Sequence, residues 1–437
     1  MGKYFGTDGI RGRFGLELNS AIAFKLGQSL KNAIASDTIV IGMDTRESSS
    51  ELMYSVVSGA QSMGLNVIVA GVLPTPMIAY YSWVNKIGGV MITASHNPYK
   101  DNGIKVFDQG KKTSEAQEKI IEEYIDNQPS FEVMTLGKVY GGEDVFDEYL
   151  NLIETLELSP TSKKVAIDTA NGANHLVAPG ILRELTDDFM QIGDNPDGKN
   201  INKGVGSTHI DAIKETVKLH QCDLGLSFDG DGDRILVVDQ EGFLYDGDLL
   251  IYILAKDLKE RGLLRNDKVV LTVMSNLGII KALERAGIEV IKTKVGDKYV
   301  MEALEREDAS IGGENSGHII LRDFTPTGDG LFVGLYLLEM LSRKDTSLKE
   351  LINDVHMWPQ VLTNIRTYST DILEDDRVKE VIKEVEDTVG EDGKVLIRKS
   401  GTEPLIRVTI SAKTEELVEK YTEQIVSVIN QVKDEVK

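Results

Sequence analysis

The sequence lacks the features of a secreted, membrane or nucleic-acid-binding protein. Cys222 is the only cysteine in 437 residues, which excludes an intrachain disulfide and a cysteine-based zinc site. No apolar run reaches the ~18 residues that a membrane-spanning helix needs, and the first residues do not read as a signal peptide. Basic residues are scarce, with 48 Lys and Arg against 70 Asp and Glu and a net charge of −22. The negative electrostatic field of such a chain repels nucleic acid and anionic membranes, so we expect a cytoplasmic protein that binds neither. Any anionic substrate must then be held by a local cluster of basic residues.

The sequence does contain a repeated pattern of strand, helix and strand. Apolar runs typical of buried strands begin at Thr38, Lys164 and Lys268, and each is followed by a helical stretch and a second apolar run. This repetition predicts three similar α/β domains with mixed, largely parallel sheets. After Pro359 the order changes to strand, helix, strand, strand, helix, which predicts a small C-terminal α+β domain. The expected domains cover residues 1–150, 151–246, 247–360 and 361–437.

A serine follows one of the predicted buried strands. The run Gly88–Ile92 leads into residues 93–98, TASHNP, which we term the serine turn, and Pro98 biases Asn97 away from the helical region. By itself, this pattern is more typical of a cap than of a catalytic group. Ligands of α/β layers, however, bind beyond the carboxyl ends of strands, which is where Ser95 is expected.

Three aspartates alternate with glycines in a second loop. We call Asp229, Asp231 and Asp233 the aspartate loop. Hard carboxylate oxygens on a tight turn suit Mg²⁺, and crowded like charges would repel each other without a cation. A calcium EF-hand would need Gly and Glu where Arg234 and Gln240 stand, so that site is excluded.

Two further loops carry groups suited to a sugar phosphate. Residues 312–318, GGENSGH, form a polar loop whose side chains could bind vicinal hydroxyls, although an ordinary polar turn is as common. Residues 398–407 form a basic loop whose guanidinium and hydroxyl groups favour a phosphate clamp over a plain charged hairpin. The glycine-rich opening, residues 4–12, could bring Arg11 to a phosphate, or could be a turn before the first helix. Because no Walker A pattern is present, a nucleotide P-loop is excluded.

Together, a serine, a metal loop, a hydroxyl-binding loop and a phosphate clamp predict phosphoryl transfer on a sugar phosphate. The segments 4–12, 93–98, 229–234, 313–318 and 398–404 occur in an order that resembles the α-D-phosphohexomutases, most closely the bacterial phosphoglucosamine mutases, over essentially the whole chain. The resemblance implies four domains around a central cleft. It also implies conversion of glucosamine 6-phosphate into glucosamine 1-phosphate through glucosamine 1,6-bisphosphate, on the route to UDP-N-acetylglucosamine and cell wall. A phosphomannomutase or phosphoglucomutase of the same superfamily is the alternative, and a phosphatase and a non-enzymatic sugar-phosphate sensor are more distant ones. The sequence leaves a homodimer open.

The resemblance also assigns roles to single residues. Ser95 would carry the phosphate and, with the aspartate loop (Asp229, Asp231 and Asp233), would hold one Mg²⁺ per active site. The substrate would be bound by sugar-contacting and phosphate-contacting residues, namely Glu314, Ser316, Arg398, Ser400, Gly401, Thr402 and Arg407. The candidates for the general acid or base are Lys105, Arg11 and His318, of which Lys105 is favoured. After Lys105, a loop over residues 106–112 is expected to be shorter than is usual for the family.

Overall fold

The computed structural model describes residues 2–6, 8–127, 135–186, 188–367, 371–399 and 404–435. The chain forms two compact units. Unit 1 comprises Met1–Met274 and Ile288–Ile352, and unit 2 comprises Ser275–Gly287 and Asn353–Lys437. Among the described residues, no helix has both the length and the apolar character needed to cross a bilayer.

In the described part of unit 1, three sheets repeat one arrangement of four strands, in which the second strand in sequence lies at one side and the fourth at the other. The first three strands are parallel and the fourth is antiparallel. In spatial order, the first sheet contains β4 (Asn66–Val72), β3 (Thr38–Met43), β5 (Gly88–Ile92) and β6 (Asp101–Asp108). The second sheet contains β10 (Phe189–Ile192), β9 (Val165–Asp168), β11 (Leu224–Phe228) and β12 (Ile235–Asp239). The third sheet contains β15 (Glu289–Thr293), β14 (Lys268–Thr272), β16 (Ile311–Gly313) and β17 (Ile319–Leu321).

Because the arrangement repeats, the three predicted functional loops lie at equivalent positions in the three sheets. The serine turn joins β5 to β6 and the aspartate loop joins β11 to β12. The polar loop joins β16 to β17 through residues 314–318, since its first two residues end β16. Each loop therefore follows the carboxyl end of the third strand of its sheet, the edge at which α/β domains bind ligands.

Short strands extend the first two sheets. The first gains β1 (Phe5–Gly6), β2 (Gly9–Arg13), β7 (Lys111–Lys112) and β8 (Val139–Gly141), and the second gains β13 (Leu244–Tyr245). The expected loop over residues 106–112 is wrong except at 109–110, because β6 continues to Asp108 and the chain then turns back into β7 at Lys111. The reason is that β6 pairs with both β5 and β2 and is buried on both faces, so it has no alternation that would mark a strand.

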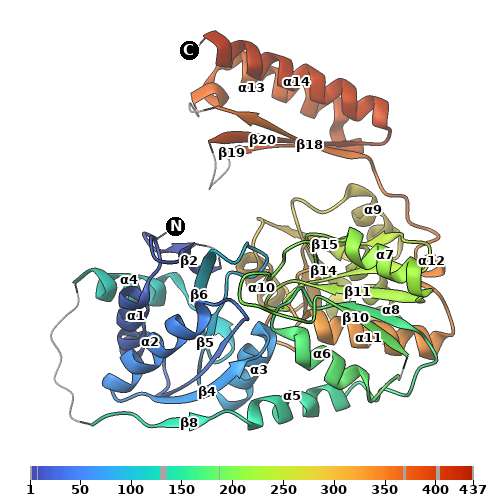
Figure 1. Cartoon of the computed structure of the whole chain (residues 1–437). Helices are drawn as coiled ribbons and strands as arrows, with labels where there is room; N and C mark the ends of the chain where they lie inside the picture. Colours follow the sequence, from blue (N-terminus) through green and yellow to red (C-terminus); the bar gives the residue numbers. More distant parts are fainter. Residues whose placement is uncertain are drawn as a thin grey trace. The chain divides into compact units, whose positions relative to one another are not determined.

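Helices cover the sheets of unit 1 (Figure 1). They are α1 (Ser20–Ala33), α2 (Ser49–Ser62), α3 (Thr75–Asn85), α4 (Glu115–Asn127), α5 (Asp144–Glu154), α6 (Asn174–Leu182), α7 (Asp211–His220), α8 (Gly247–Glu260), α10 (Asp297–Arg306), α11 (Gly330–Lys344) and α12 (Leu348–Leu351), with a 3₁₀ turn at Arg265–Asp267. In the first sheet, side chains of β3 alternate between two cores. Ile39 and Ile41 pack with α1 and α2, whereas Val40 packs with α3 on the other face.

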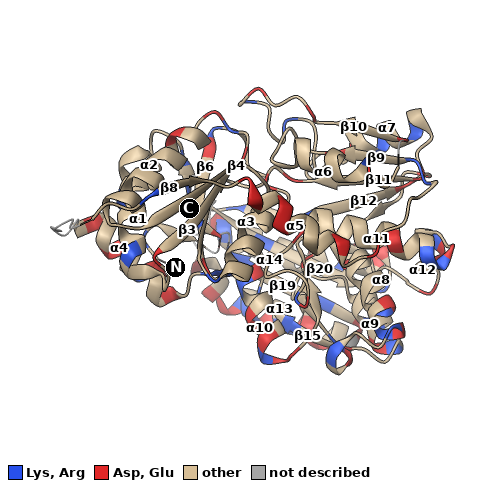
Figure 2. Ribbon diagram, turned by 90° about the horizontal axis from the view of Figure 1, so that it is seen from below, with Lys and Arg blue, Asp and Glu red and all other residues tan. Residues whose placement is uncertain are grey.

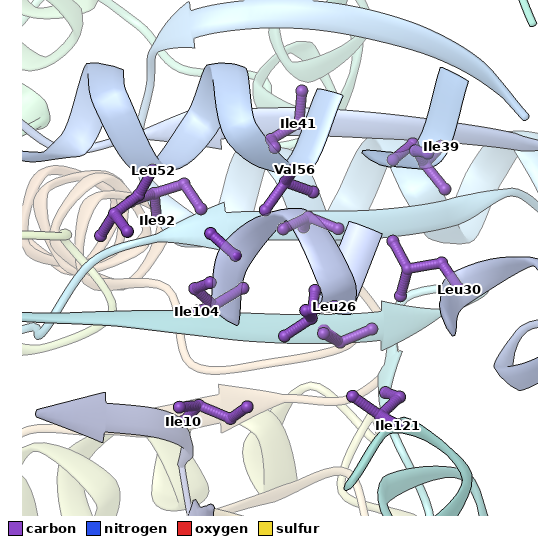
Figure 3. Packing of buried hydrophobic residues seen from close by; sticks show 14 of the residues in the cluster. Ile10, Leu26, Leu30, Ile39, Ile41, Leu52, Val56, Ile92, Ile104 and Ile121 are labelled. Atoms are coloured by element: carbon purple, nitrogen blue, oxygen red, sulfur yellow. The ribbon is translucent and has the colours of Figure 1, made fainter. Parts of the chain in front are cut away.

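The larger core of the first domain is formed by aliphatic side chains of α1, α2 and the central strands (Figure 3). Leu26 and Leu30 of α1 and Leu52 of α2 are fully buried, and each such side chain contributes roughly 1.5–3 kcal/mol through burial. The two helices touch through their backbones at Gly59, where a Cβ atom would lie only 2.1 Å from the Phe24 carbonyl oxygen. An alanine at this position would push the two helices apart.

Unit 2 contains an antiparallel sheet, β18 (Gln360–Arg366), β20 (Leu405–Ala412) and β19 (Gly393–Lys399) in that order. Its helices are α9 (Leu277–Arg285), α13 (Asp376–Val389) and α14 (Glu415–Glu435), with 3₁₀ turns at Asp371–Glu374 and Gly390–Asp392. Helices α13 and α14 cover one face of the sheet through Ile406, Val408 and Ile410 (Figure 1). The predicted strand–helix–strand–strand–helix order is confirmed.

Surface helices differ in the charges that they carry. Along α5, Figure 2 shows Asp and Glu without Lys or Arg, whereas α10 carries both signs. Basic groups near a bound anion must therefore come from particular loops and strands rather than from a general positive surface.

Candidate active site

Ser95 contacts the aspartate loop directly. Its Oγ donates a hydrogen bond to Asp229 Oδ2 at 2.6 Å, and its backbone N–H donates to Thr93 Oγ1 at 2.8 Å. The His96 Nδ1 lies 3.3 Å from the same Oγ. Burial, together with Arg234 and Arg11, lowers the pKa of His96 to about 4, so this ring is neutral at pH 7. Two loops from separate sheets thus bring a hydroxyl against a carboxylate.

The aspartate loop has the geometry of a cation site. Asp229, Asp231 and Asp233 are all buried, and one oxygen of each lies within 4.8 Å of the others. Among the described residues, neither Asp231 Oδ1 nor Asp233 Oδ1 has a hydrogen-bond partner. Burial and the two neighbouring carboxylates raise the pKa of Asp229 well above its ordinary value. Buried carboxylate oxygens that accept no hydrogen bond fit a hard divalent cation, because such a cation would satisfy them and relieve the repulsion.

Thr75 and Lys105 hold the aspartate loop against the first domain. Thr75 begins α3, and its hydroxyl donates to Asp231 Oδ2 at 2.6 Å while its backbone N–H donates to the Asp231 carbonyl oxygen at 2.9 Å. Lys105, buried on β6, places its Nζ 2.8 Å from Asp231 Oδ2 and 2.8 Å from Asp233 Oδ2. Burial alone would lower the pKa of Lys105, but Asp231, Asp233 and Asp8 raise it well above its ordinary value. Lys105 is therefore protonated at neutral pH in this arrangement.

The Asp8 carboxylate contacts three positively charged side chains at the edge of the site. Its carboxylate forms ion pairs with Arg11 on β2 and with Lys112 on β7, and it lies 3.3 Å from Lys105 Nζ. Burial alone would raise the pKa of Asp8, but Lys105, Lys112 and Arg11 hold it well below its ordinary value. Arg11 and Lys105, two of the three candidates for the general acid or base, therefore lie beside the same carboxylate.

His318 contacts the other carboxylate oxygen of Asp233 than Lys105 does. Its Nδ1 is 3.6 Å from Asp233 Oδ1 and its Nε2 is 3.6 Å from Asp297 Oδ2, the first residue of α10. Asp297 also forms an ion pair with Lys112, which pairs with Asp8. These contacts join the first and third domains around Lys105 and His318 in one chain of alternating charges.

The polar loop presents two groups suited to hydroxyl binding. Glu314 is half-buried, and its Oε1 accepts a hydrogen bond from the Gly296 N–H at 2.9 Å. Gly296 has φ +129°, a conformation that a side chain would disfavour. Ser316 Oγ is buried and has no hydrogen-bond partner among the described residues, so it is available to a ligand.

Only part of the predicted phosphate clamp lies within the described residues. Arg398 on β19 and Arg407 on β20 are directly paired, so their side chains share one face of the sheet. This face is opposite the one that packs on α13 and α14, since the neighbouring Ile406 and Val408 point to the helices. Ser400, Gly401 and Thr402 lie outside the described residues.

The sequence reasoning missed Asp8, Thr75, Lys112 and Asp297 as members of the site. Asp8 stands in the glycine-rich opening, which gave it a weak signal, whereas nothing in the sequence pattern marked Asp297. Thr75 precedes Pro76 at the start of a helix, a pattern that indicates helix initiation and nothing more. Their contacts depend on which sheet edges meet, which residue types alone do not indicate.

Comparisons with known proteins agree with the fold and the site. The chain matches the family described as phosphoglucomutase/phosphomannomutase, in alpha/beta/alpha domain I over residues 2–131, domain II over 147–242, domain III over 246–357 and the C-terminal domain over 362–428. It is 44% identical to a phosphoglucosamine mutase of Macrococcus caseolyticus over 442 residues, covering 98% of this chain and 99% of that protein. It is 44% identical to a phosphoglucosamine mutase of Bacillus cytotoxicus, covering 98% of each.

A solved structure of a phosphoglucomutase/phosphomannomutase family protein from Burkholderia thailandensis superposes with a TM-score of 0.83 at 22% identity, covering 98% of this chain and 97% of the other. This likeness confirms the predicted fold class, and the 44% identical relatives confirm the family resemblance. The chain belongs to the phosphoglucosamine mutases of the α-D-phosphohexomutase superfamily and is an isomerase.

Proposed function

We propose that this chain interconverts glucosamine 6-phosphate and glucosamine 1-phosphate through a phosphate carried on Ser95 and a bound glucosamine 1,6-bisphosphate. The observation that carries the proposal is the 2.6 Å contact between Ser95 Oγ and Asp229 Oδ2. A serine in this position can receive a phosphoryl group beside a cation site. The relatives at 44% identity are named as phosphoglucosamine mutases, which favours the amino sugar over mannose or glucose.

We assign Asp229, Asp231 and Asp233 as ligands of one Mg²⁺, with an oxygen on Ser95 as a further ligand. The support is that Asp231 Oδ1 and Asp233 Oδ1 are buried and accept no hydrogen bond from the described residues, together with the preference of Mg²⁺ for carboxylates. A bound Mg²⁺ supplies neutralisation of the charge on the transferring phosphoryl group.

The reaction consists of two transfers. In the first, the sugar O1 hydroxyl attacks the phosphorus on Ser95, the bond from phosphorus to Ser95 Oγ breaks, and the bisphosphate forms. In the second, after the bisphosphate turns over, Ser95 Oγ attacks the phosphorus on O6, the bond from O6 to phosphorus breaks, and glucosamine 1-phosphate leaves. The phosphate on Ser95 is thereby restored, so no phosphate is consumed.

Each transfer moves a proton to or from a sugar oxygen. Lys105 is assigned to this role, with Arg11 and His318 as the alternatives. The protonated Lys105 suits the step in which a sugar oxygen leaves phosphorus, because that oxygen must gain a proton. By microscopic reversibility, Lys105 must be neutral when the sugar hydroxyl attacks, so that step requires the ammonium beside Asp231 and Asp233 to lose its proton first.

The remaining assigned residues bind the substrate. Glu314 and Ser316 bind sugar hydroxyls, supported by the unpartnered Ser316 Oγ. The phosphate that is not reacting is assigned to Arg398, Ser400, Gly401, Thr402 and Arg407. Binding energy from that phosphate positions the reacting oxygen, which a phosphatase would not need. The product is a precursor on the route to UDP-N-acetylglucosamine and cell wall.

The test is ³¹P NMR of the full-length protein with Mg²⁺ and, separately, the 6-phosphates of glucosamine, mannose and glucose. We expect the 1-phosphate of glucosamine to form fastest, without accumulation of inorganic phosphate. A faster reaction with mannose or glucose 6-phosphate would overturn the substrate assignment. Release of inorganic phosphate at the rate of isomerisation would instead indicate a phosphatase.

A further inference from the structure

Arg46 is a fully buried guanidinium that none of the assigned roles uses. It follows the carboxyl end of β3, the strand beside β5, and forms an ion pair with Asp44 in which both side chains are 0% exposed. A buried ion pair is weak evidence for stability, because removing two charges from water opposes their attraction. The ion pair with Asp44 therefore does not by itself explain why Arg46 is buried here, and the explanation must come from its other contacts.

Arg46 donates hydrogen bonds to the carbonyl oxygens of the serine turn. Its Nη2 contacts the Ser95 oxygen at 3.2 Å and the Asn97 oxygen at 2.5 Å, and its Nε contacts the Asp101 oxygen at 2.8 Å. Two of these acceptors lie within the serine turn and the third belongs to the first residue of β6, so one guanidinium ties the turn to the strand that follows it. A lysine could not reproduce this pattern, because its ammonium is a compact donor without a planar fork.

A second donor, from the second domain, contacts the same atoms. Asn202 Nδ2 donates to the Ser95 oxygen at 2.9 Å and to the Asn97 oxygen at 3.2 Å. Gly230, inside the aspartate loop, lies so close that a Cβ atom would come within 2.7 Å of the Ser95 oxygen. The Ser95 carbonyl is thus fixed from both domains at the point where the serine turn and the aspartate loop meet.

The backbone of Ser95 requires such support. Its φ is +52°, in the left-handed region that is strained for residues other than glycine. Strained residues of this kind persist where the surrounding contacts over-determine them. In this conformation Ser95 Oγ points to Asp229, whereas relaxation of the turn would move the hydroxyl away from the cation site.

We propose that Arg46 is a positioning residue for phosphoryl transfer, which keeps Ser95 Oγ directed at the aspartate loop, with Asn202 as a second support. The inference rests on the proposed function of Ser95. It predicts that loss of Arg46 slows transfer without weakening substrate binding, because Arg46 contacts the backbone beneath the serine and not the ligand. A one-ångström displacement of a reacting group can lower a rate by about 10²-fold.

The experiment compares full-length wild type with Arg46→Lys, Asn202→Ala and the control Arg343→Lys. Arg343 also pairs with a fully buried carboxylate, that of Asp257, but it joins α11 to α8. For each protein we would measure kcat and KM with glucosamine 6-phosphate, the ³¹P resonance of the phosphoserine, and the melting temperature. The expected results are a decrease in kcat of about 10²-fold for Arg46→Lys and about tenfold for Asn202→Ala, with KM within about threefold and a shifted ³¹P resonance.

Arg343→Lys should lower the melting temperature without changing kcat or the ³¹P resonance. An unchanged kcat in Arg46→Lys, or an equal loss in Arg343→Lys, would overturn the inference. If Arg46→Lys fails to fold, Asn202→Ala decides, because it leaves the ion pair of Arg46 intact, and an unchanged kcat would again overturn it. Failure of wild type to isomerise any hexose phosphate would instead refute the proposed function.

Discussion

Replacing Thr75 by Val tests whether the first domain holds the aspartate loop ready for a cation. Thr75 is 1% exposed, and its hydroxyl donates to Asp231 Oδ2 at 2.6 Å. Valine keeps the branched shape and the backbone N–H that donates to the Asp231 carbonyl oxygen, so only the hydroxyl is lost. A hydrogen bond to a charged group contributes about 1.5–3 kcal/mol, which is the expected loss in the free energy of unfolding.

The same change should weaken cation binding. Without the hydroxyl, Asp231 keeps its contact with Lys105 at 2.8 Å, and its carboxylate is free to turn towards the ammonium. Loss of an outer-shell hydrogen bond commonly costs 10–100-fold in metal affinity, so the Mg²⁺ concentration for half-maximal activity should rise by about that factor. The assay is a Mg²⁺ titration of isomerisation, with thermal melts of the same samples.

A matched control separates the two effects. Thr216 of α7 is also buried, and its hydroxyl donates to the Ala212 carbonyl oxygen at 2.9 Å. Thr216→Val therefore removes a buried hydroxyl away from the aspartate loop and should leave the Mg²⁺ dependence unchanged. If Thr75→Val has the Mg²⁺ dependence of wild type, or if both variants shift equally, the reasoning about the aspartate loop is refuted.

Other predictions concern transfer, binding and pH. Replacing Ser95 by Ala removes the phosphoryl acceptor and should lower turnover by at least about 10³-fold with little change in melting temperature; a substantially active variant would contradict covalent transfer. Arg407→Ala should raise KM for both isomers by about 10–100-fold and change kcat less, and steady-state kinetics in both directions would show an unchanged KM if the clamp is misassigned. Gly230→Ala places a Cβ atom 2.7 Å from the Ser95 carbonyl oxygen and should lower kcat, so wild-type kcat in this variant would contradict the close approach of the two loops. Burial raises the pKa of Asp329 from 3.8 to about 6, so the folded state binds this proton more tightly and loses stability as the pH rises through about 6. Asp329→Asn removes that loss and should be more stable than wild type by up to about 3 kcal/mol above pH ~6 and equally stable below pH ~4; melts across this range that keep a constant difference would disprove it.

Much of the fold could be predicted because hydrophobic periodicity is a local property. The strand expected from Thr38 is β3, Thr38–Met43, and the helix expected to close the C-terminal domain is α14, Glu415–Glu435. The pattern failed at β6, Asp101–Asp108, because a strand buried on both faces shows neither alternation nor a clear end. Strand order within the sheets depends on pairing between distant segments, which local periodicity does not contain.

The sequence by itself determined which loops are the candidates for chemistry. A serine after a buried strand and three alternating aspartates indicate a nucleophile and a metal site through residue type and spacing alone. Only the tertiary structure brought these loops together, with Ser95 and Asp229 in hydrogen-bond contact across 134 residues of chain. It also placed Arg46 beneath the serine turn and Thr75 against Asp231. The physical reason is that hydrogen bonds and buried ion pairs form where packed sheet edges meet, and that meeting is set by the cores of separate domains rather than by neighbouring residues.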